Sequence, residues 1–189
     1  HSERTPDVER AEGQKMLGLQ SWIALPKAQE EILPSFQHYA ASDLPTVRDT
    51  GLSARVIAGK AFGKSSPVAM VSDWFYVEVT LEAGRSAPLD TDYEERAIYL
   101  VEGEVQIAGD RFTAPQLLIF RPGDRITVNA VTNTRMMFLG GSALEGPRHI
   151  WWNFVSSSKE RIEQAKADWK AGRFDPVPQE HEFIPLPER

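Results

Sequence analysis

The chain contains 189 residues, of which 41% are hydrophobic and 25% are charged, a composition typical of a folded globular protein. Its 27 acidic and 21 basic residues give a formal net charge of −6. This charge argues against direct binding to nucleic acid or to an anionic membrane, because phosphate binding needs a concentrated positive surface. The absence of cysteine excludes disulfides, thiolate metal ligands and a cysteine nucleophile. No apolar run has the length of a membrane span and no signal-peptide pattern is found, so we expect a soluble, cytoplasmic protein.

The first three residues, His1-Ser2-Glu3, form a candidate metal-binding motif. On an extended segment the side chains of His1 and Glu3 point the same way and can bind one metal ion. A usable site needs three or four protein ligands, and no second His-x-His or His-x-x-x-Glu motif follows in the sequence. We therefore expect that the sequence opens within a metal site whose other ligands lie upstream.

Two other interpretations of this motif stay open. His1 and Glu3 can belong to a frayed terminus that has no ligand role. Alternatively, His1 is a processed N-terminus that chelates copper through its amine and imidazole, with His38, His149 or His181 as the second histidine. His38 and His181 lie in polar or Pro-rich sequence that is typical of a solvated surface, and His149 is expected to be structural.

Hydrophobic alternation predicts a protein built mainly of strands. Residues 15–25 alternate well enough for a strand that ends at Pro26, and residues 26–45 are expected to form an extended connector with one short strand near 36–40. From about Leu52 onward, short apolar segments separated by turn residues are typical of a sandwich or barrel.

The segment 74–81 shows this alternation most clearly. Its expected apolar face consists of Phe75, Val77, Val79 and Leu81, and its other face of Trp74, Tyr76, Glu78 and Thr80. Such strands at roughly ten-residue spacing favour a closed antiparallel barrel.

A helix is predicted only near the C-terminus. Residues 157–160 (SSKE) form a capping box, in which the Ser157 side chain is expected to bond the backbone N–H of Glu160. An apolar stripe at helical spacing follows, and Trp169 within it is the expected docking anchor. Gly172 is the natural C-terminal stop. The stripe consists of Ile162, Ala165 and Trp169.

Several of these segments together resemble the pirin family of two-barrel cupins (bicupins). They are residues 1–3, residues 19–26 (LQSWIALP), the tail 183–187 (FIPLP) and above all residues 147–174, which begin PRHIWWNFVSSSKERIEQAK. The resemblance covers essentially the whole chain. It implies an all-β fold, namely a cupin barrel (double-stranded β-helix or jelly-roll) with one C-terminal α-helix.

The same resemblance implies three regions. Residues 1–45 would be the last strands of an N-terminal cupin barrel plus a linker, residues 46–146 a C-terminal cupin barrel without metal ligands, and residues 147–189 a C-terminal strand, helix and Pro-rich tail. A barrel cut in this way exposes unpaired strand edges, so we expect the chain to dimerise through those edges, swap strands or aggregate unless something covers them.

In the pirin family the N-terminal barrel binds one metal ion, usually iron, through three histidines and a glutamate. The resemblance implies that His1 and Glu3 belong to this ligand set, with Glu3 also able to accept a substrate proton as the catalytic residue. The implied activity of the whole protein is a mononuclear non-haem iron dioxygenase of the quercetin 2,3-dioxygenase type, acting on a small aromatic, flavonol-like substrate. The alternative is a non-enzymatic regulatory module in which a redox-sensitive metal site tunes binding to a protein partner. Because the other ligands lie outside the sequence, we expect negligible metal and negligible activity from this chain alone.

The C-terminal barrel resembles the cupin metal-binding frame from Gly84 to Gly103, but the ligand positions are replaced. Asp90 and Asp92 stand where the family frame has histidines, and Arg96 stands where it has a glutamate. In the later motif, Ile126 takes the place of the histidine. A guanidinium repels a bound cation, so we infer that this barrel binds no transition metal.

Two arrangements of these charges stay open. If the strand runs unbroken, Asp90, Asp92 and Arg96 share the face that continues with Ile98 and Leu100, and Arg96 can pair with an aspartate in the barrel mouth. Otherwise these charges extend into solvent from a loop.

Overall fold

The structure is a computed structural model that describes residues 3, 5–13, 15–89 and 93–188 of the chain. It divides into two compact units, one formed by Glu31–Leu144 and the other by the two segments that precede and follow that range. We call them the barrel unit and the hairpin–helix unit. Among the described residues no helix has the length and apolarity needed to cross a membrane.

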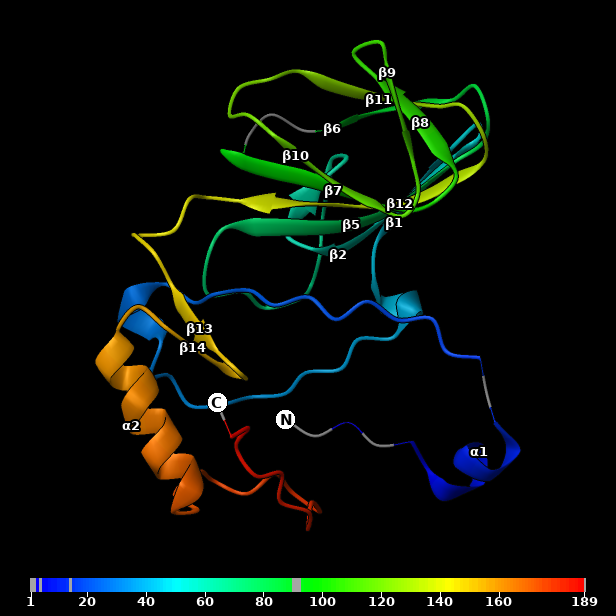
Figure 1. Ribbon diagram of the computed structural model, residues 1–189. Helices are drawn as coiled ribbons and strands as arrows, with labels where there is room; N and C mark the ends of the chain where they lie inside the picture. Colours follow the sequence, from blue (N-terminus) through cyan, green and yellow to red (C-terminus); the bar gives the residue numbers. More distant parts are fainter. Residues whose placement is uncertain (1–2, 4, 14, 90–92, 189) are drawn as a thin grey trace. The chain divides into compact units, whose positions relative to one another are not determined.

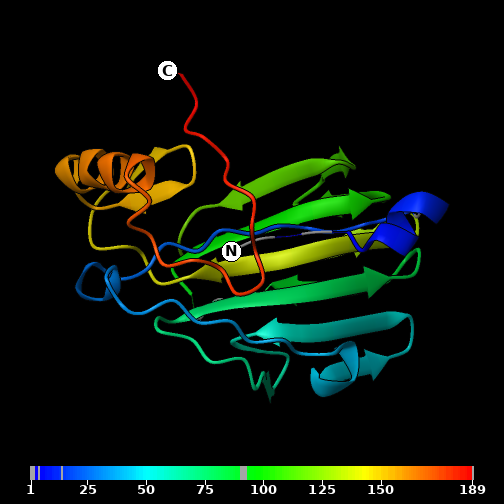
Figure 2. The same cartoon turned by 90° about the horizontal axis from the view of Figure 1, so that it is seen from below.

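The barrel unit consists of two antiparallel sheets, one with six strands and one with four (Figure 1). Figure 2 shows the strands of the larger sheet side by side. In spatial order the larger sheet contains β1 (Thr46–Asp49), β2 (Leu52–Ala58), β5 (Trp74–Leu81), β12 (Thr134–Gly141), β7 (Glu95–Glu102) and β10 (Gln116–Phe120). The smaller sheet contains β6 (Ser86–Leu89), β11 (Ile126–Ala130), β8 (Glu104–Ile107) and β9 (Asp110–Thr113). A short hairpin of β3 (Lys60–Ala61) and β4 (Lys64–Ser65) completes the unit.

The core of the barrel unit lies between the two sheets and follows the predicted alternation. On β5 the four predicted inward side chains are at most 2% exposed, whereas the alternate ones are half-buried or exposed. On β7 the buried face continues through Arg96, Ile98 and Leu100. Because successive side chains on a strand point to opposite sides, each strand gives one face to the core. The alternation predicted for 74–81 is therefore confirmed.

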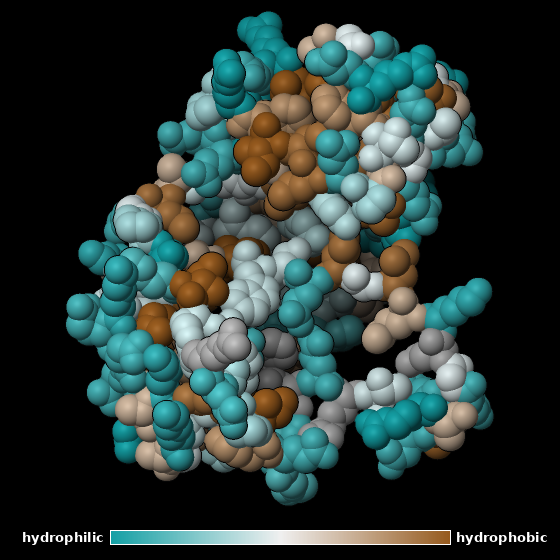
Figure 3. Space-filling model, viewed as in Figure 1, coloured by the Kyte–Doolittle hydropathy of each residue, from teal (hydrophilic) through white to brown (hydrophobic). Residues whose placement is uncertain are grey.

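β10 is an edge strand of the larger sheet, and its outer face carries exposed apolar side chains. Leu117 and Ile119 are 52% and 78% exposed. Apolar side chains reach the surface of the barrel unit in Figure 3. Dimerisation through exposed strand edges stays a prediction.

The prediction of two strands before the barrel is wrong. Residues 15–26 and 33–40 form no strand, and the connector instead carries two short 3₁₀ turns, at Lys27–Gln29 and Ala41–Asp43. Alternation fixes only which way side chains point, whereas a strand also needs a neighbour for its backbone N–H and C=O groups. In the described part of the chain these segments have no such neighbour. A six-residue helix, α1 (Asp7–Glu12), was not predicted.

The hairpin–helix unit contains the hairpin of β13 (His149–Trp151) and β14 (Phe154–Ser156), followed by α2 (Lys159–Lys170). The predicted helix is confirmed, but its N-cap is one residue later than predicted. Ser158, not Ser157, accepts the backbone N–H of Arg161 at 3.2 Å, because Ser157 bonds elsewhere. Gly172 has a φ of +65°, which fits the predicted stop after the helix.

Aromatic packing holds α2 against the hairpin and the tail. The ring of Trp169 lies 5.3 Å from Trp152, 5.5 Å from Phe174 and 5.5 Å from Phe183, measured between centroids. The indole N–H of Trp169 also donates a 2.8 Å hydrogen bond to the carbonyl of Ile184. Trp169 is therefore the docking anchor that its position on the helical stripe predicted.

A buried ion pair joins the connector to this hairpin. The Nε atom of Arg148 lies 2.7 Å from Oε1 of Glu30, and the two side chains are only 5% and 13% exposed. Glu30 also accepts hydrogen bonds from the backbone and the hydroxyl of Ser157 at 3.0 Å, and from the hydroxyl of Ser156 at 3.2 Å. Arg148 donates a further bond of 2.8 Å to the carbonyl of Leu25. This network is why Ser157 is not available as the N-cap.

The network also changes the acidity of Glu30. Burial alone would raise the pKa of its carboxyl group, but hydrogen bonds from Ser157 and Ser156 and the charge of Arg148 outweigh burial and hold the pKa below its ordinary value of 4.5. The ionised form of Glu30 is therefore favoured in the folded protein.

Replacing Glu30 by glutamine should destabilise the hairpin–helix unit, because it leaves the guanidinium of Arg148 buried without its counter-charge. We expect Glu30→Gln to lower the free energy of unfolding by about 2 kcal/mol. Urea titration followed by near-UV circular dichroism of the tryptophan cluster measures this loss. Glu12→Gln, at an exposed site on α1, is the matched control. A loss equal to that of the control would contradict the role of Glu30.

The pH dependence of this stabilisation follows from the lowered pKa of Glu30. A carboxyl group with a lower pKa in the folded state stabilises the fold above its ordinary pKa, and the stabilisation is lost as the pH falls through the folded-state value. We expect the difference in unfolding free energy between the wild type and Glu30→Gln to be constant above about pH 6 and to shrink below pH 4.5. A difference that stays constant down to about pH 3 would show that Glu30 is not the titrating group.

Candidate functional site

The predicted metal-binding residues are only partly within the described structure. Glu3 lies at the surface and accepts a 3.0 Å hydrogen bond from the side-chain amide of Gln20, whose oxygen in turn accepts a 3.4 Å bond from the indole of Trp22. His1 lies outside the described residues, so its pairing with Glu3 stays a prediction. In the part of the chain that the structure describes, no three His, Cys, Asp or Glu side chains gather where they could hold a metal ion. Glu3 alone does not fit a metal site, which needs three or four ligands.

The other histidines have the surroundings that their sequence context predicted. His38 and His181 are exposed, and His149 is half-buried on β13. The copper hypothesis needs one of these histidines beside His1. Because His1 lies outside the described residues, that pairing stays a prediction.

Inside the barrel, the structure settles one of the two alternatives for Arg96. This side chain is 1% exposed and shares the inward face of β7 with Ile98 and Leu100. Its Nη2 atom donates a 3.0 Å hydrogen bond to the carbonyl of Arg121. The alternative in which Arg96 extends into solvent is therefore wrong, because the strand runs unbroken from Glu95 and alternation turns Arg96 inward. Pairing of Arg96 with Asp90 or Asp92 stays a prediction, since both aspartates lie outside the described residues.

A glycine on the neighbouring strand makes room around Arg96. Gly140 on β12 pairs with Arg96 on β7. A Cβ atom at Gly140 would lie 2.1 Å from the carbonyl oxygen of Glu95, 2.7 Å from the ring of Phe75 and 3.1 Å from the Cα of Arg96. The Phe75 ring uses this space and packs 4.6 Å from the ring of Tyr93, centroid to centroid. The sequence pattern did not reveal this arrangement, because Gly140 looks like the first residue of a turn.

A pocket of about 510 Å³ opens into the barrel unit, and we call it the barrel pocket. Phe75 and Phe138, which line it, are nearly fully buried, and Ile126 is half-buried. Its described lining contains no imidazole and no carboxylate, so these residues do not fit a metal cation. The lining consists of Ala61, Phe62, Gly63, Phe75, Pro88, Leu89, Arg125, Ile126, Thr127 and Phe138.

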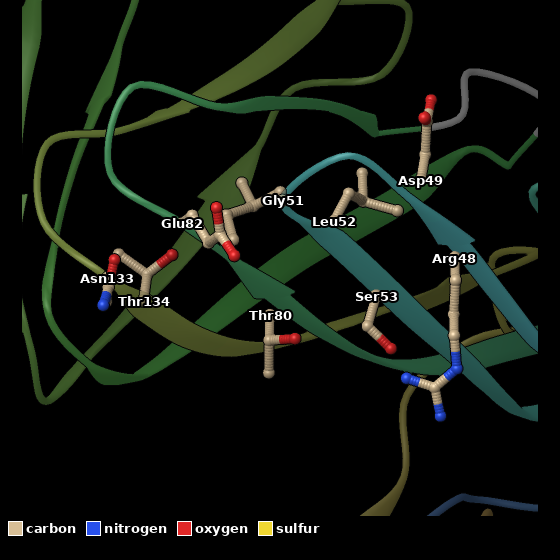
Figure 4. Close-up of a pocket in the computed structure, with 10 residues that line it drawn as sticks. Arg48, Asp49, Gly51, Leu52, Ser53, Thr80, Glu82, Asn133 and Thr134 are labelled. Carbon is tan, nitrogen blue, oxygen red and sulfur yellow. The ribbon is translucent and has the colours of Figure 1, made fainter.

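A second pocket, of about 380 Å³, lies beside the turn between β1 and β2 (Figure 4). Ser53 and Thr80, which are paired across β2 and β5, project to one side of the sheet, whereas Arg48 and Asp49 point in opposite directions. Charges of both signs line this pocket without converging on one point. The barrel pocket, with its apolar walls, is therefore the stronger candidate for ligand binding in this unit.

Comparison with known proteins identifies relatives of the whole chain. The family model described as the pirin C-terminal cupin domain matches residues 76–175. A pirin-like protein of Caulobacter vibrioides is 49% identical over 190 residues, which cover 100% of this chain and 65% of that protein.

Two crystal structures of quercetin 2,3-dioxygenase from Acinetobacter baumannii superpose on this chain. The TM-scores are 0.77 and 0.75, with identities of 24% and 25%. The matches cover 82% and 89% of this chain but only 56% and 58% of those chains. The predicted all-β cupin fold with a C-terminal helix is confirmed, and the chain spans less than two thirds of the length of these relatives.

Truncation of Arg96 should reveal how much the barrel depends on this buried side chain. We expect Arg96→Ala to lower the free energy of unfolding by about 3 kcal/mol, because it opens a cavity and removes the hydrogen bond to the Arg121 carbonyl. Arg96→Met keeps most of the side-chain volume, so its free energy of unfolding should fall by less than that of Arg96→Ala. Arg48→Ala, at an exposed position of the same unit, should change stability by under about 0.5 kcal/mol. Equal urea midpoints for Arg96→Ala and Arg48→Ala would contradict the packing role of Arg96.

Proposed function

The chain belongs to the pirin family, and on this premise we propose that the whole protein is a metal-dependent dioxygenase of the quercetin 2,3-dioxygenase type. The observation that supports the proposal is the likeness to the Acinetobacter quercetin 2,3-dioxygenase, which extends over 89% of this chain at a TM-score of 0.75. The chain spans 58% of that enzyme, so the proposed activity belongs to a protein longer than the sequence described.

We propose that His1 and Glu3 are two ligands of a single iron ion and that the remaining ligands come from sequence before them. Such an ion would supply oxygen activation and open positions for a small aromatic substrate. The structure shows Glu3 as a surface carboxylate that already accepts one hydrogen bond, from Gln20.

In this proposal Glu3 accepts the proton of a substrate hydroxyl, because a carboxylate within hydrogen-bond distance of a weak acid can act as a general base. Gln20 acts through Glu3: its amide donates to Oε1 and fixes the direction of the carboxylate. The described lining of the barrel pocket contains no carboxylate or imidazole that could act as the base in this step.

Turnover of quercetin by the full-length, iron-loaded protein tests the proposed activity. Product formation is expected, and Glu3→Gln should lower kcat by about 100-fold, the usual scale for loss of a general base. Glu12→Gln, a charge-neutralising change at an exposed site of α1, should leave kcat unchanged.

Measurement of the iron content alongside turnover separates the two hypotheses for this family member. A fully metallated, full-length sample that forms no product would contradict the enzyme and favour the regulatory module with a redox-sensitive metal. Full activity and full iron content in Glu3→Gln would show that Glu3 has neither role.

A further inference from the structure

The barrel pocket has a preformed aromatic wall. Phe75, Phe138 and Leu89 line it and are at most 2% exposed, so core packing on their far sides fixes their positions. Phe75 is held by the ring of Tyr93 at 4.6 Å between centroids. Pockets of this size that combine rigid apolar walls with a few polar groups are typical of small-molecule sites.

Phe62 forms another wall and adopts an unfavourable backbone conformation. It has a φ of +50° and is followed by Gly63 with a φ of +70° in the turn between β3 and β4. A turn with positive φ at both central residues favours Asn-Gly, because a bulky side chain is disfavoured in the left-handed region. The ring of Phe62 lies 6.3 Å from that of Phe138, with an interplanar angle of 24°. A strained residue whose side chain lines a pocket points to a role in that pocket.

The charge at this pocket is positive. Arg125 is the one charged residue in the described lining, and it is exposed. A guanidinium presents a planar pair of N–H groups that matches the two oxygens of a carboxylate.

From these observations we propose that the barrel pocket binds a planar aromatic carboxylate of one or two rings. The ring would lie against Phe62 and Phe138, and the carboxylate would pair with Arg125. Glu3 is not among the residues that line the barrel pocket, and the ligand proposal does not depend on the proposed oxygenase activity, so the two proposals succeed or fail independently.

Calorimetric titration of the chain with 2-naphthoate tests the proposal, with 2-naphthamide as the neutral analogue and 2-naphthylmethylamine as the cationic one. We expect 2-naphthoate to bind with a Kd on the order of 0.1 mM, a value reasonable for a ligand of this size. The amide should bind about tenfold more weakly and the cation more weakly still.

Two variants and one control assign the roles of the side chains. Arg125→Gln should weaken 2-naphthoate binding by about tenfold and leave 2-naphthamide binding unchanged, since only the carboxylate uses the guanidinium. Phe62→Asn should weaken binding of both ligands while the melting temperature stays close to that of the wild type, because asparagine suits the turn. Arg48→Gln makes the same charge change outside the barrel pocket and should have no effect on binding.

Methyl NMR localises the ligand. Saturating 2-naphthoate should shift the methyl signals of Ile126, which lines the pocket, and leave those of the exposed Ile119 on β10 unmoved. Absence of binding, equal affinities for the carboxylate and the amide, preference for the cation, or shifts at Ile119 instead of Ile126 would each overturn the proposal.

Discussion

Strand alternation within the two-sheet barrel unit determines which side chains the interior of that unit presents to a ligand. Each strand places every second side chain inside, and on β7 these positions hold Arg96, Ile98 and Leu100. A guanidinium has no lone pair to offer a cation, so Arg96 cannot be a metal ligand. The barrel pocket has Phe75 and Phe138 among its walls and Arg125 in its lining, so it favours apolar and anionic ligands over metal ions.

The two units thus carry different chemistry. The oxygen ligand with a candidate metal role, Glu3, lies in the hairpin–helix unit, where the Glu30–Arg148 pair fixes the connector against β13 and β14. The barrel unit contributes a pocket with apolar walls and one arginine, Arg125, in its described lining. In the proposed whole protein, different residues of one chain would therefore serve oxygen activation and ligand binding in the C-terminal barrel.

Patterns that depend on local geometry were predicted correctly from the sequence. The two faces of β5 and the anchoring role of Trp169 follow from a period of two or 3.6 residues, whereas the inward direction of Arg96 was one of two open alternatives. Features that depend on a partner far away in the sequence were not predicted. The strand at 15–25 needed a neighbour, and Ser157 lost the N-cap position because it bonds Glu30, more than a hundred residues earlier. The space that Gly140 leaves for Phe75, and the pocket beside it, could likewise not be predicted from spacing.

Anomalous X-ray diffraction at the iron edge, from crystals of the whole iron-loaded protein, shows directly which unit holds the metal. We expect one anomalous peak within coordination distance of the Glu3 carboxylate and no peak in the barrel pocket. A peak between Phe75 and Ile126 would contradict the assignment of metal binding and apolar binding to different parts of the chain.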